Sequence, residues 1–93
     1  MEPDFRWDTA KARTNLAKHG VSFSEAVTVF ADPLARILND LVHSIDERRQ
    51  IIIGHSNRLR LLVISFVERG GATRIISARP ATRSERAEYE ESF

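Results

Sequence analysis

The sequence predicts an α+β fold in which helices come first and an antiparallel sheet follows. Three observations predict this class: two capped helical segments before residue 33, β-branched runs with short turns from residue 34 to 79, and a capped segment after Pro80. Helices segregated along the chain from an antiparallel meander are typical of α+β folds. A chain of 93 residues has room for one domain, and we expect that domain to span residues 1–93.

A short strand and a first helix are predicted before residue 20. Residues 5–7 alternate apolar and polar side chains, as an edge strand does. Asp8 is placed to cap a helix over residues 9–19, because its short side chain can accept a backbone hydrogen bond from the first turn. Gly20 follows in the position where helices favour a left-handed backbone, and it predicts the end of this helix.

A second helix is predicted to begin after Ser22. Ser22 and Glu25 have the spacing of a capping box, in which the two side chains bind each other's free backbone amides. Asp32-Pro33 ends the helix, since proline cannot continue it. The apolar residues predicted to be buried are Phe5, Trp7, Phe23, Ala26, Val27 and Phe30.

After Pro33 the apolar pattern changes to that of a meander of about four strands, followed by one short helix. A polar loop is expected at residues 43–47, and short turns at residues 56–58 and 70–71. Thr82 and Glu85 again have capping-box spacing and predict a final helix reaching Tyr89. The predicted strands are residues 34–38, 48–55, 59–67 and 73–79.

Composition excludes several classes of protein. Cysteine is absent, so disulfides and thiolate zinc sites are excluded, and we expect a reducing cytoplasm. We expect neither a secretory signal nor a membrane span, because the longest apolar runs are far too short. The net charge is only +1, but nine arginines lie between Arg48 and Arg86 and four glutamates lie in the last nine residues. Guanidinium groups form paired hydrogen bonds with phosphate, so this distribution points to nucleic acid, although solvated sheet faces explain it equally well.

Several short motifs stand in a fixed order along the chain. They are Phe5-Arg6-Trp7-Asp8, Lys18-His19-Gly20-Val21-Ser22-Phe23, Phe30-Ala31-Asp32-Pro33, Glu47-Arg48-Arg49, Arg74-Ile75-Ile76-Ser77-Ala78-Arg79 and Glu85-Arg86. Each motif alone is weak, but the series in register resembles the BrnT family over residues 5–89.

The resemblance implies a RelE-like fold and the toxin half of a type II toxin–antitoxin pair. It implies a metal-independent ribonuclease without a cofactor, acting on mRNA, free or on the ribosome, and thereby inhibiting translation. It also implies a BrnA-type antitoxin as partner, with promoter DNA bound only through the antitoxin complex. The alternative is a non-catalytic basic module that binds nucleic acid or the antitoxin, because a fold alone does not guarantee activity.

RNA cleavage without a metal requires one titratable group and several cations. The 2′-hydroxyl attacks the adjacent phosphate, so a side chain must move protons while cations stabilise the extra negative charge. His19 is our first candidate for proton transfer. Lys11, Asn15 and Lys18 share one helical face with it and are predicted to bind RNA. The alternative for His19 is a structural role at the helix end, where a basic side chain offsets the helix dipole.

Arg48 and Arg79 are predicted to be catalytic because each stands at the end of a strand next to a loop. Arg79 shares strand parity with Ile75 and Ser77, which places it at the border of a buried face. The alternative for Arg79 is a structural salt bridge with Glu85 or Glu88. His43 and His55 are weaker candidates, and no spacing of histidine and acidic residues predicts a metal site.

Two residues of the final helix complete the predicted RNA-binding set. Arg83 lies at the helix start, where the free amides near Thr82 suit an anion. Tyr89 can stack on a base of single-stranded RNA, or else pack its ring on the sheet and leave its hydroxyl in water.

Overall fold

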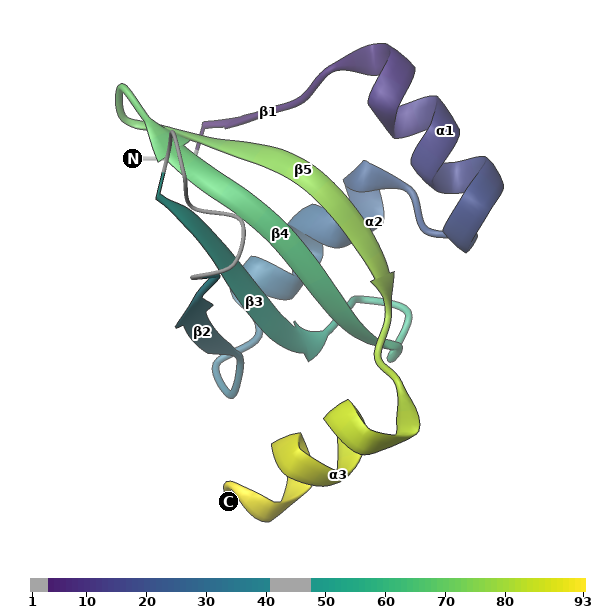
Figure 1. Ribbon diagram of the computed structural model, residues 1–93, viewed down its shortest axis with the longest axis vertical. Helices are drawn as coiled ribbons and strands as arrows, with labels where there is room; N and C mark the ends of the chain where they lie inside the picture. The colour runs from purple at the N-terminus through teal and green to yellow at the C-terminus, as the bar shows by residue number, and fades with distance from the viewer. Residues whose placement is uncertain (1–3, 41–47) are drawn as a thin grey trace.

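A computed structural model describes residues 4–40 and 48–93 (Figure 1). Its elements are β1 (Phe5–Arg6), α1 (Thr9–His19), α2 (Phe23–Thr28), the 3₁₀ turn η1 (Val29–Ala31), β2 (Arg36–Asn39), β3 (Arg49–His55), β4 (Leu61–Arg69), β5 (Ala72–Pro80) and α3 (Arg83–Glu91). The strands form one sheet in the order β1-β5-β4-β3-β2. The α+β class predicted from the sequence is confirmed.

The sheet has five strands, not about four, because the N-terminal strand joins the meander. β1 pairs parallel to β5, with Phe5 opposite Thr73 and Arg6 opposite Arg74, and the Thr73 amide donates to the Asp4 carbonyl at 2.8 Å. All the other pairings are antiparallel. Alternation over residues 5–7 predicted the strand, but its partner lies almost seventy residues away.

Capping residues set the helix boundaries as predicted. The Asp8 side chain accepts from the Lys11 amide, and Gly20 has φ 70° just past α1. The Ser22 side chain accepts from the Glu25 amide at the start of the second helix, but the reciprocal half of the predicted capping box does not form among the described residues, because the Glu25 carboxylate accepts from Arg60 and from the Ser56 hydroxyl. That helix is shorter than expected, because the α-helix ends at Thr28 and the chain tightens into η1.

The strand ends differ from the predicted ones by at most two residues. The β3–β4 turn is longer than residues 56–58: the Ser56 amide donates to the Arg60 carbonyl, and Leu59 has φ 60°, so β4 begins at Leu61. Leu34 precedes β2 instead of belonging to it. The predicted polar loop at residues 43–47 lies outside the described residues.

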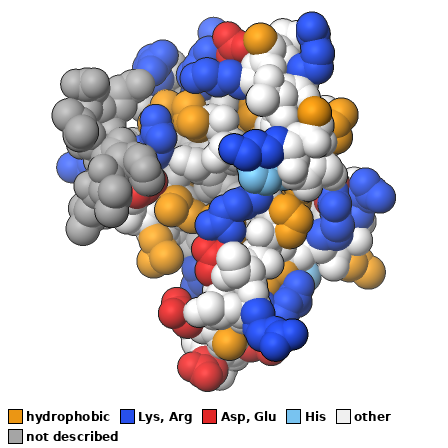
Figure 2. All heavy atoms as spheres, turned by 45° about the vertical axis from the view of Figure 1, so that its right-hand side comes forward, with side chains coloured by type: hydrophobic (Ala, Val, Ile, Leu, Met, Phe, Trp, Pro, Cys, Tyr) orange, Lys and Arg blue, Asp and Glu red, His pale blue; other side chains and the backbone are white. Residues whose placement is uncertain are grey.

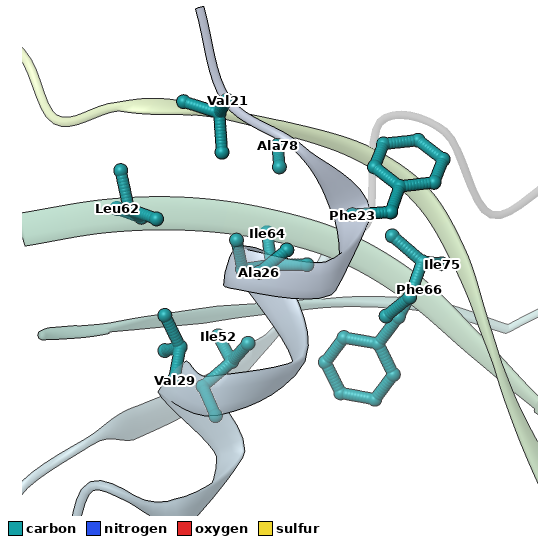
Figure 3. Packing of buried hydrophobic residues seen from close by; sticks show 10 residues of the cluster. All are labelled: Val21, Phe23, Ala26, Val29, Ile52, Leu62, Ile64, Phe66, Ile75 and Ala78. Carbon is teal, nitrogen blue, oxygen red and sulfur yellow. The ribbon is translucent and has the colours of Figure 1, made fainter. Parts of the chain in front are cut away.

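The hydrophobic core lies between one face of the sheet and α2 with η1 (Figure 3). Ala26 of α2 and Val29 of η1 face the three central strands across this layer. Trp7, Val27 and Phe30 are partly buried and pack against the core, as does Phe5. The buried cluster is Val21, Phe23, Ala26, Val29, Ile52, Leu62, Ile64, Phe66, Ile75 and Ala78. We call the side of the sheet away from this cluster the open face.

A β-bulge in β5 changes which residues reach the open face. Ser77 pairs with Ser65, but the next pair along β5 is Ile75 with Phe66, so Ile76 has no partner opposite it on β4. Ile75 and Ala78 both lie in the core cluster although they are three residues apart. The expected parity of Arg79 with Ile75 is therefore wrong: Arg79 shares the open face with Ser77, while Ile75 faces the core, because a bulge breaks the two-residue period.

The third helix covers one end of the open face. Residues from β2, β3, β4 and α3 line an apolar groove of about 350 Å³ there. Arg36 of β2 donates to the Ser92 carbonyl at 2.7 Å and lies 4.6 Å from the centre of the Phe93 ring, so the end of the chain is fixed to β2. The groove is lined by Arg36, Leu38, Ile51, Ile53, Val63, Glu85, Glu88, Tyr89 and Ser92.

Candidate functional site

A second groove runs between α1 and β5 and brings together four residues predicted from the sequence. It has a volume of about 330 Å³, and none of its lining residues is acidic. It is lined by Ala10, Lys11, Thr14, Asn15, Lys18, His19, Ile76 and Ser77. We call it the basic groove. The spacing along α1 correctly placed Lys11, Asn15, Lys18 and His19 on one face.

The floor of the basic groove is formed by the bulge in β5. Ile76 and Ser77 are consecutive, yet both line the groove. Regular strand alternation would send one of them to the core face. The bulge thus places both Ile76 and Ser77 on the floor of the groove.

Asn15 lies in the groove wall but is itself buried, with 6% of its surface exposed. Its amide nitrogen donates to the carbonyls of Val21 and Ala78 at 2.9 and 2.8 Å, and its oxygen accepts from the Ala78 amide at 3.1 Å. All these partners are backbone groups, so the side chain ties α1 to β5. Lys11 and Lys18 are exposed and His19 is half-buried.

A buried ion pair holds the chain that follows His19. Arg60 donates to the Gly20 carbonyl at 3.0 Å and through its Nε to Glu25 at 2.9 Å. Glu25 is 6% exposed and also accepts from the Ser56 hydroxyl at 2.7 Å. The Arg60 hydrogen bonds, opposed by burial and aided by Ser56, lower the pKa of Glu25. This network fixes the C-terminal end of α1 to the β3–β4 turn and so fixes the backbone beside His19.

Arg79 forms a two-pronged salt bridge with Glu85, which is the structural alternative raised by the sequence. Its terminal nitrogens lie 2.7 and 2.8 Å from the two Glu85 oxygens. The hydrogen bonds from Arg79 lower the pKa of Glu85 to about 2. The Arg79 side chain is still 39% exposed, and it shares the open face with Ser77. Arg79 therefore lies beside the basic groove with its charge largely compensated by α3.

The other predicted residues of α3 are not grouped with the basic groove. Two of the amides near Thr82, its own and that of Glu85, are occupied, because Thr82 and Glu85 bind each other in a complete capping box. Arg83 is exposed at the helix start. The Tyr89 ring is buried, with 6% exposed, and its hydroxyl donates to the Leu34 carbonyl at 3.3 Å. Burial raises the pKa of Tyr89.

Arg48 lies at the other end of the sheet from Arg79. It is exposed and precedes β3, whose first residue Arg49 pairs with Val67. Val67 pairs in turn with Arg74, five residues before Arg79 on β5. The structure thus separates Arg48 from His19 and Arg79. His55 lies beside Asp32 and Tyr89, away from the basic groove, and His43 is outside the described residues.

Lys and Arg side chains spread over the face that carries α1 and β5, with a histidine among them, as Figure 2 shows. In the part of the chain that the structure describes, no three histidine or acidic side chains come close enough together to hold one metal ion. None of the helices within 4–40 and 48–93 has the length and apolar character needed to cross a membrane.

Two residues at this site were not singled out in the sequence. Ser77 lies on the groove floor. Arg74 lies on the open face near the start of β5, where it pairs with Arg6 of β1 and Val67 of β4. The adjacent pair Ile75-Ile76 within one strand was the available indication, because two large apolar residues in succession face opposite sides unless a bulge intervenes.

Comparison with known proteins agrees with the family predicted from the sequence. The family model described as a ribonuclease toxin, BrnT, of type II toxin-antitoxin systems matches residues 7–85. The chain is also similar to the 1.1 Å crystal structure of the Brucella abortus ribonuclease toxin BrnT, with 27% identity, a TM-score of 0.69, and coverage of 88% of this chain and 100% of that one. No curated protein sequence matches the chain. Because the family model spans most of the sequence, the chain belongs to the BrnT family of ribonuclease toxins of type II toxin–antitoxin systems.

Proposed function

We propose that the chain cleaves RNA without a metal ion and that cleavage takes place in the basic groove. One observation carries the proposal: the groove brings His19 together with Lys11 and Lys18, and none of its lining residues is acidic. A titratable group beside cations is the minimum that phosphate-ester cleavage through the 2′-hydroxyl requires.

In the proposed reaction, His19 moves a proton at the scissile phosphate. The 2′-oxygen loses its proton and bonds to phosphorus, the bond to the 5′-oxygen breaks, and that oxygen gains a proton. The products are a 2′,3′-cyclic phosphate and a 5′-hydroxyl. Lys18, next to His19, holds the phosphate and stabilises its added negative charge, and Lys11, nearer the other end of the groove, binds the neighbouring backbone. Arg79, on the open face, adds positive charge that stabilises the phosphate, but its salt bridge to Glu85 compensates much of that charge.

The remaining residues predicted from the sequence have different roles in the proposal. Asn15 supports RNA binding by holding the groove wall, since its polar atoms bind backbone groups. Arg83 stays a predicted RNA contact, and Tyr89 does so only if its ring leaves its buried position. A catalytic role of Arg48 also stays a prediction, and we give it no step because it lies apart from His19.

The experiment compares purified wild-type protein with His19→Gln on a defined RNA in the presence of EDTA. We expect wild type to leave 2′,3′-cyclic phosphate ends, and the variant to be slower by about 100- to 10,000-fold, the usual contribution of a positioned proton donor or acceptor. His55→Gln is the matched control, because His55 lies outside the basic groove. Its rate is expected to stay within a few fold of wild type.

Two results would contradict this function. If cleavage stops in EDTA and returns with Mg²⁺, the reaction requires a metal ion. Absence of cleavage on naked RNA and on ribosomes alike would favour a basic module that binds without chemistry.

We also propose that the chain acts in the cytoplasm on mRNA, inhibits translation and is neutralised by a BrnA-type antitoxin, through which alone it reaches promoter DNA. Membership of a toxin family supports a neutralising partner, and the exposed cations suit an RNA substrate. Addition of the protein to a cell-free translation reaction is expected to stop synthesis, and co-expressed antitoxin to restore it. If protein synthesis continues after the wild-type protein is added, translation is not the target.

A further inference from the structure

The cations on the open face continue beyond the basic groove along β5. Arg74 pairs across the sheet with Val67 and with Arg6, so its side chain lies on the same face as Ser77 and Arg79. Arg6 is engaged with Asp4 at 2.9 Å, whereas no side-chain partner of Arg74 lies within hydrogen-bond distance among the described residues. Arg74 is half-buried, which holds its stem in place more firmly than that of a freely exposed side chain.

The helix and the strand that bound the groove run side by side in the same direction. Arg74 contributes to lowering the pKa of Asp8, whose main cause is the hydrogen bond from the Lys11 amide, so Arg74 lies near the start of α1. Asn15, in the second half of α1, binds Ala78 near the end of β5. Arg74 therefore lies at the Lys11 end of the groove and Arg79 at the His19 end.

Lys11 and Lys18 line the basic groove on the α1 side, while Arg74 and Arg79 flank its floor on the open face of β5, Arg79 being paired with Glu85. We call the groove together with these four cations the channel. Lys11 and Lys18 are about 10 Å apart along α1, at about 1.5 Å per residue. Arg74 and Arg79 are about 13 Å apart along β5, because their partners Val67 and Val63 are four residues apart on β4 at about 3.3 Å per residue and the bulge at Ile76 adds no full step. These lengths exceed one phosphate group, and Ser77 lies on the groove floor.

We propose that this channel holds the sugar–phosphate backbone of one RNA strand, with Arg74 binding a phosphate away from the one beside His19. A groove with cations on both walls encloses a single chain of phosphates, as in proteins that follow a single strand with a charged groove. A duplex is a wide cylinder with its phosphates on the outside, so it would rest on the rim of the groove and not place one chain of phosphates between α1 and β5. The Ser77 hydroxyl is available to hydrogen-bond to the ribose or phosphate between the two sites. The inference rests on the proposed function, because it takes His19 as the reacting point.

The test measures binding of an oligonucleotide that carries 2′-O-methyl groups and so cannot be cleaved. Each phosphate contact on a single strand adds about 0.7 to the slope of log affinity against log salt concentration. Arg74→Ala is expected to reduce that slope by about 0.7 and to weaken binding severalfold at low salt, while Arg74→Lys retains most of both. For cleavable RNA, Arg74→Ala is expected to raise KM with kcat nearly unchanged, because the contact is made before and during the reaction.

Arg13→Ala is the matched control, because it removes the same charge from α1 on the side that carries Trp7 and not the basic groove. It is expected to leave the slope unchanged. Thermal unfolding of both variants checks that the fold is intact. Equal slopes for Arg74→Ala and wild type, or equal effects of Arg74→Ala and Arg13→Ala, would overturn the inference.

A separate binding measurement compares single-stranded with double-stranded RNA. The same oligonucleotide annealed to its complement is expected to bind at least tenfold more weakly, and equal binding would overturn the single-strand channel. If wild type cleaves RNA while Arg74→Ala keeps the full salt slope, the inference fails and the proposed function stands. If wild type binds with the predicted slopes but cleaves nothing, the proposed function fails and the channel stands.

Discussion

The Asn15 side chain takes the place of a missing strand at the edge of β5. β1 pairs with β5 only at residues 73 and 74, which leaves the outer amide and carbonyl of Ala78 without a strand partner. Asn15 binds both of them and also the Val21 carbonyl. Exposed sheet edges are commonly covered in folded proteins, and here one amide side chain does so while fixing the wall of the basic groove.

We predict that Asn15→Leu lowers the free energy of unfolding by about 2–4 kcal/mol, because several buried backbone groups lose their hydrogen bonds. Urea denaturation followed by circular dichroism measures this loss. Thr14→Ala, at the neighbouring exposed position, serves as control and is expected to stay within about 0.5 kcal/mol of wild type. An Asn15→Leu protein as stable as wild type would mean that water or a local rearrangement replaces these bonds.

The Arg79–Glu85 pair makes stability depend on acid pH. The folded pKa of Glu85, about 2, lies below the ordinary value of about 4.3 for an unfolded chain. Its contribution is therefore fully present above about pH 4.3 and is lost as the pH falls through 2. Since both side chains are about one-third exposed, the contribution is at most about 1 kcal/mol.

Glu85→Gln is thus expected to lower the free energy of unfolding at pH 7 by up to about 1 kcal/mol, with a difference that shrinks between pH 4.3 and 2. Denaturation curves at a series of pH values measure it. Glu88→Gln, on the same helix, is the control and is expected to show no such trend. A difference between wild type and Glu85→Gln that stays constant down to pH 2 would contradict the assignment to this ion pair.

Short elements of this fold begin where local side chains satisfy backbone groups. Asp8, Ser22 and Thr82 each accept from an amide three residues later, so the sequence alone predicts all three helix starts. The bulge in β5 and the 3₁₀ turn after α2 could not be predicted in the same way. Val29 of the 3₁₀ turn lies close to Gly54, which is distant in the chain, and the bulge is defined only by the register of β5 against β4.

We predict that Thr82→Ala lowers stability by about 1 kcal/mol, the usual effect of losing an N-cap side chain. The Glu85 amide then loses its partner, and Glu85 is held less firmly beside Arg79. Chemical denaturation measures the change, with Ser84→Ala as a control at an exposed position of the same turn. Equal stabilities of the two variants would show that the cap contributes little to α3.

The sheet lies close to the segment that follows α2 at Gly54. A Cβ atom added there would lie 2.8 Å from the Ala35 Cβ, 3.0 Å from Asp32 Oδ2 and 3.1 Å from Val29 Cγ1. We predict that Gly54→Ala costs about 1–3 kcal/mol, as overpacking of a core does. Thermal unfolding measures the cost. Adding Ala35→Gly to this variant should cost less than the same change in wild type, and strictly additive effects would contradict a direct clash.

For the molecule as a whole, the sequence predicted the fold class and the α1 wall of the site, but not the complete site. Helical periodicity placed Lys11, Lys18 and His19 together, because they belong to one helix. Ser77 and Arg74 were missed, since their position depends on β5 lying beside α1, a contact that no local pattern encodes. Arg48 and Arg79 are both at strand ends, but strand ends lie at opposite ends of a sheet, and only the register shows which ones meet.

The parallel pairing of β1 with β5 also has a consequence for synthesis of the chain. β1 cannot pair until β5 has been synthesised, and both walls of the basic groove exist only after residue 80 has left the ribosome. Contacts this far apart in sequence close slowly and late. A fragment ending at Gly71 is expected to remain largely unfolded and to bind RNA only weakly. A chain built in this way is expected to acquire its basic groove only late in its own synthesis, so the nascent chain before that point lacks the site that we propose for RNA.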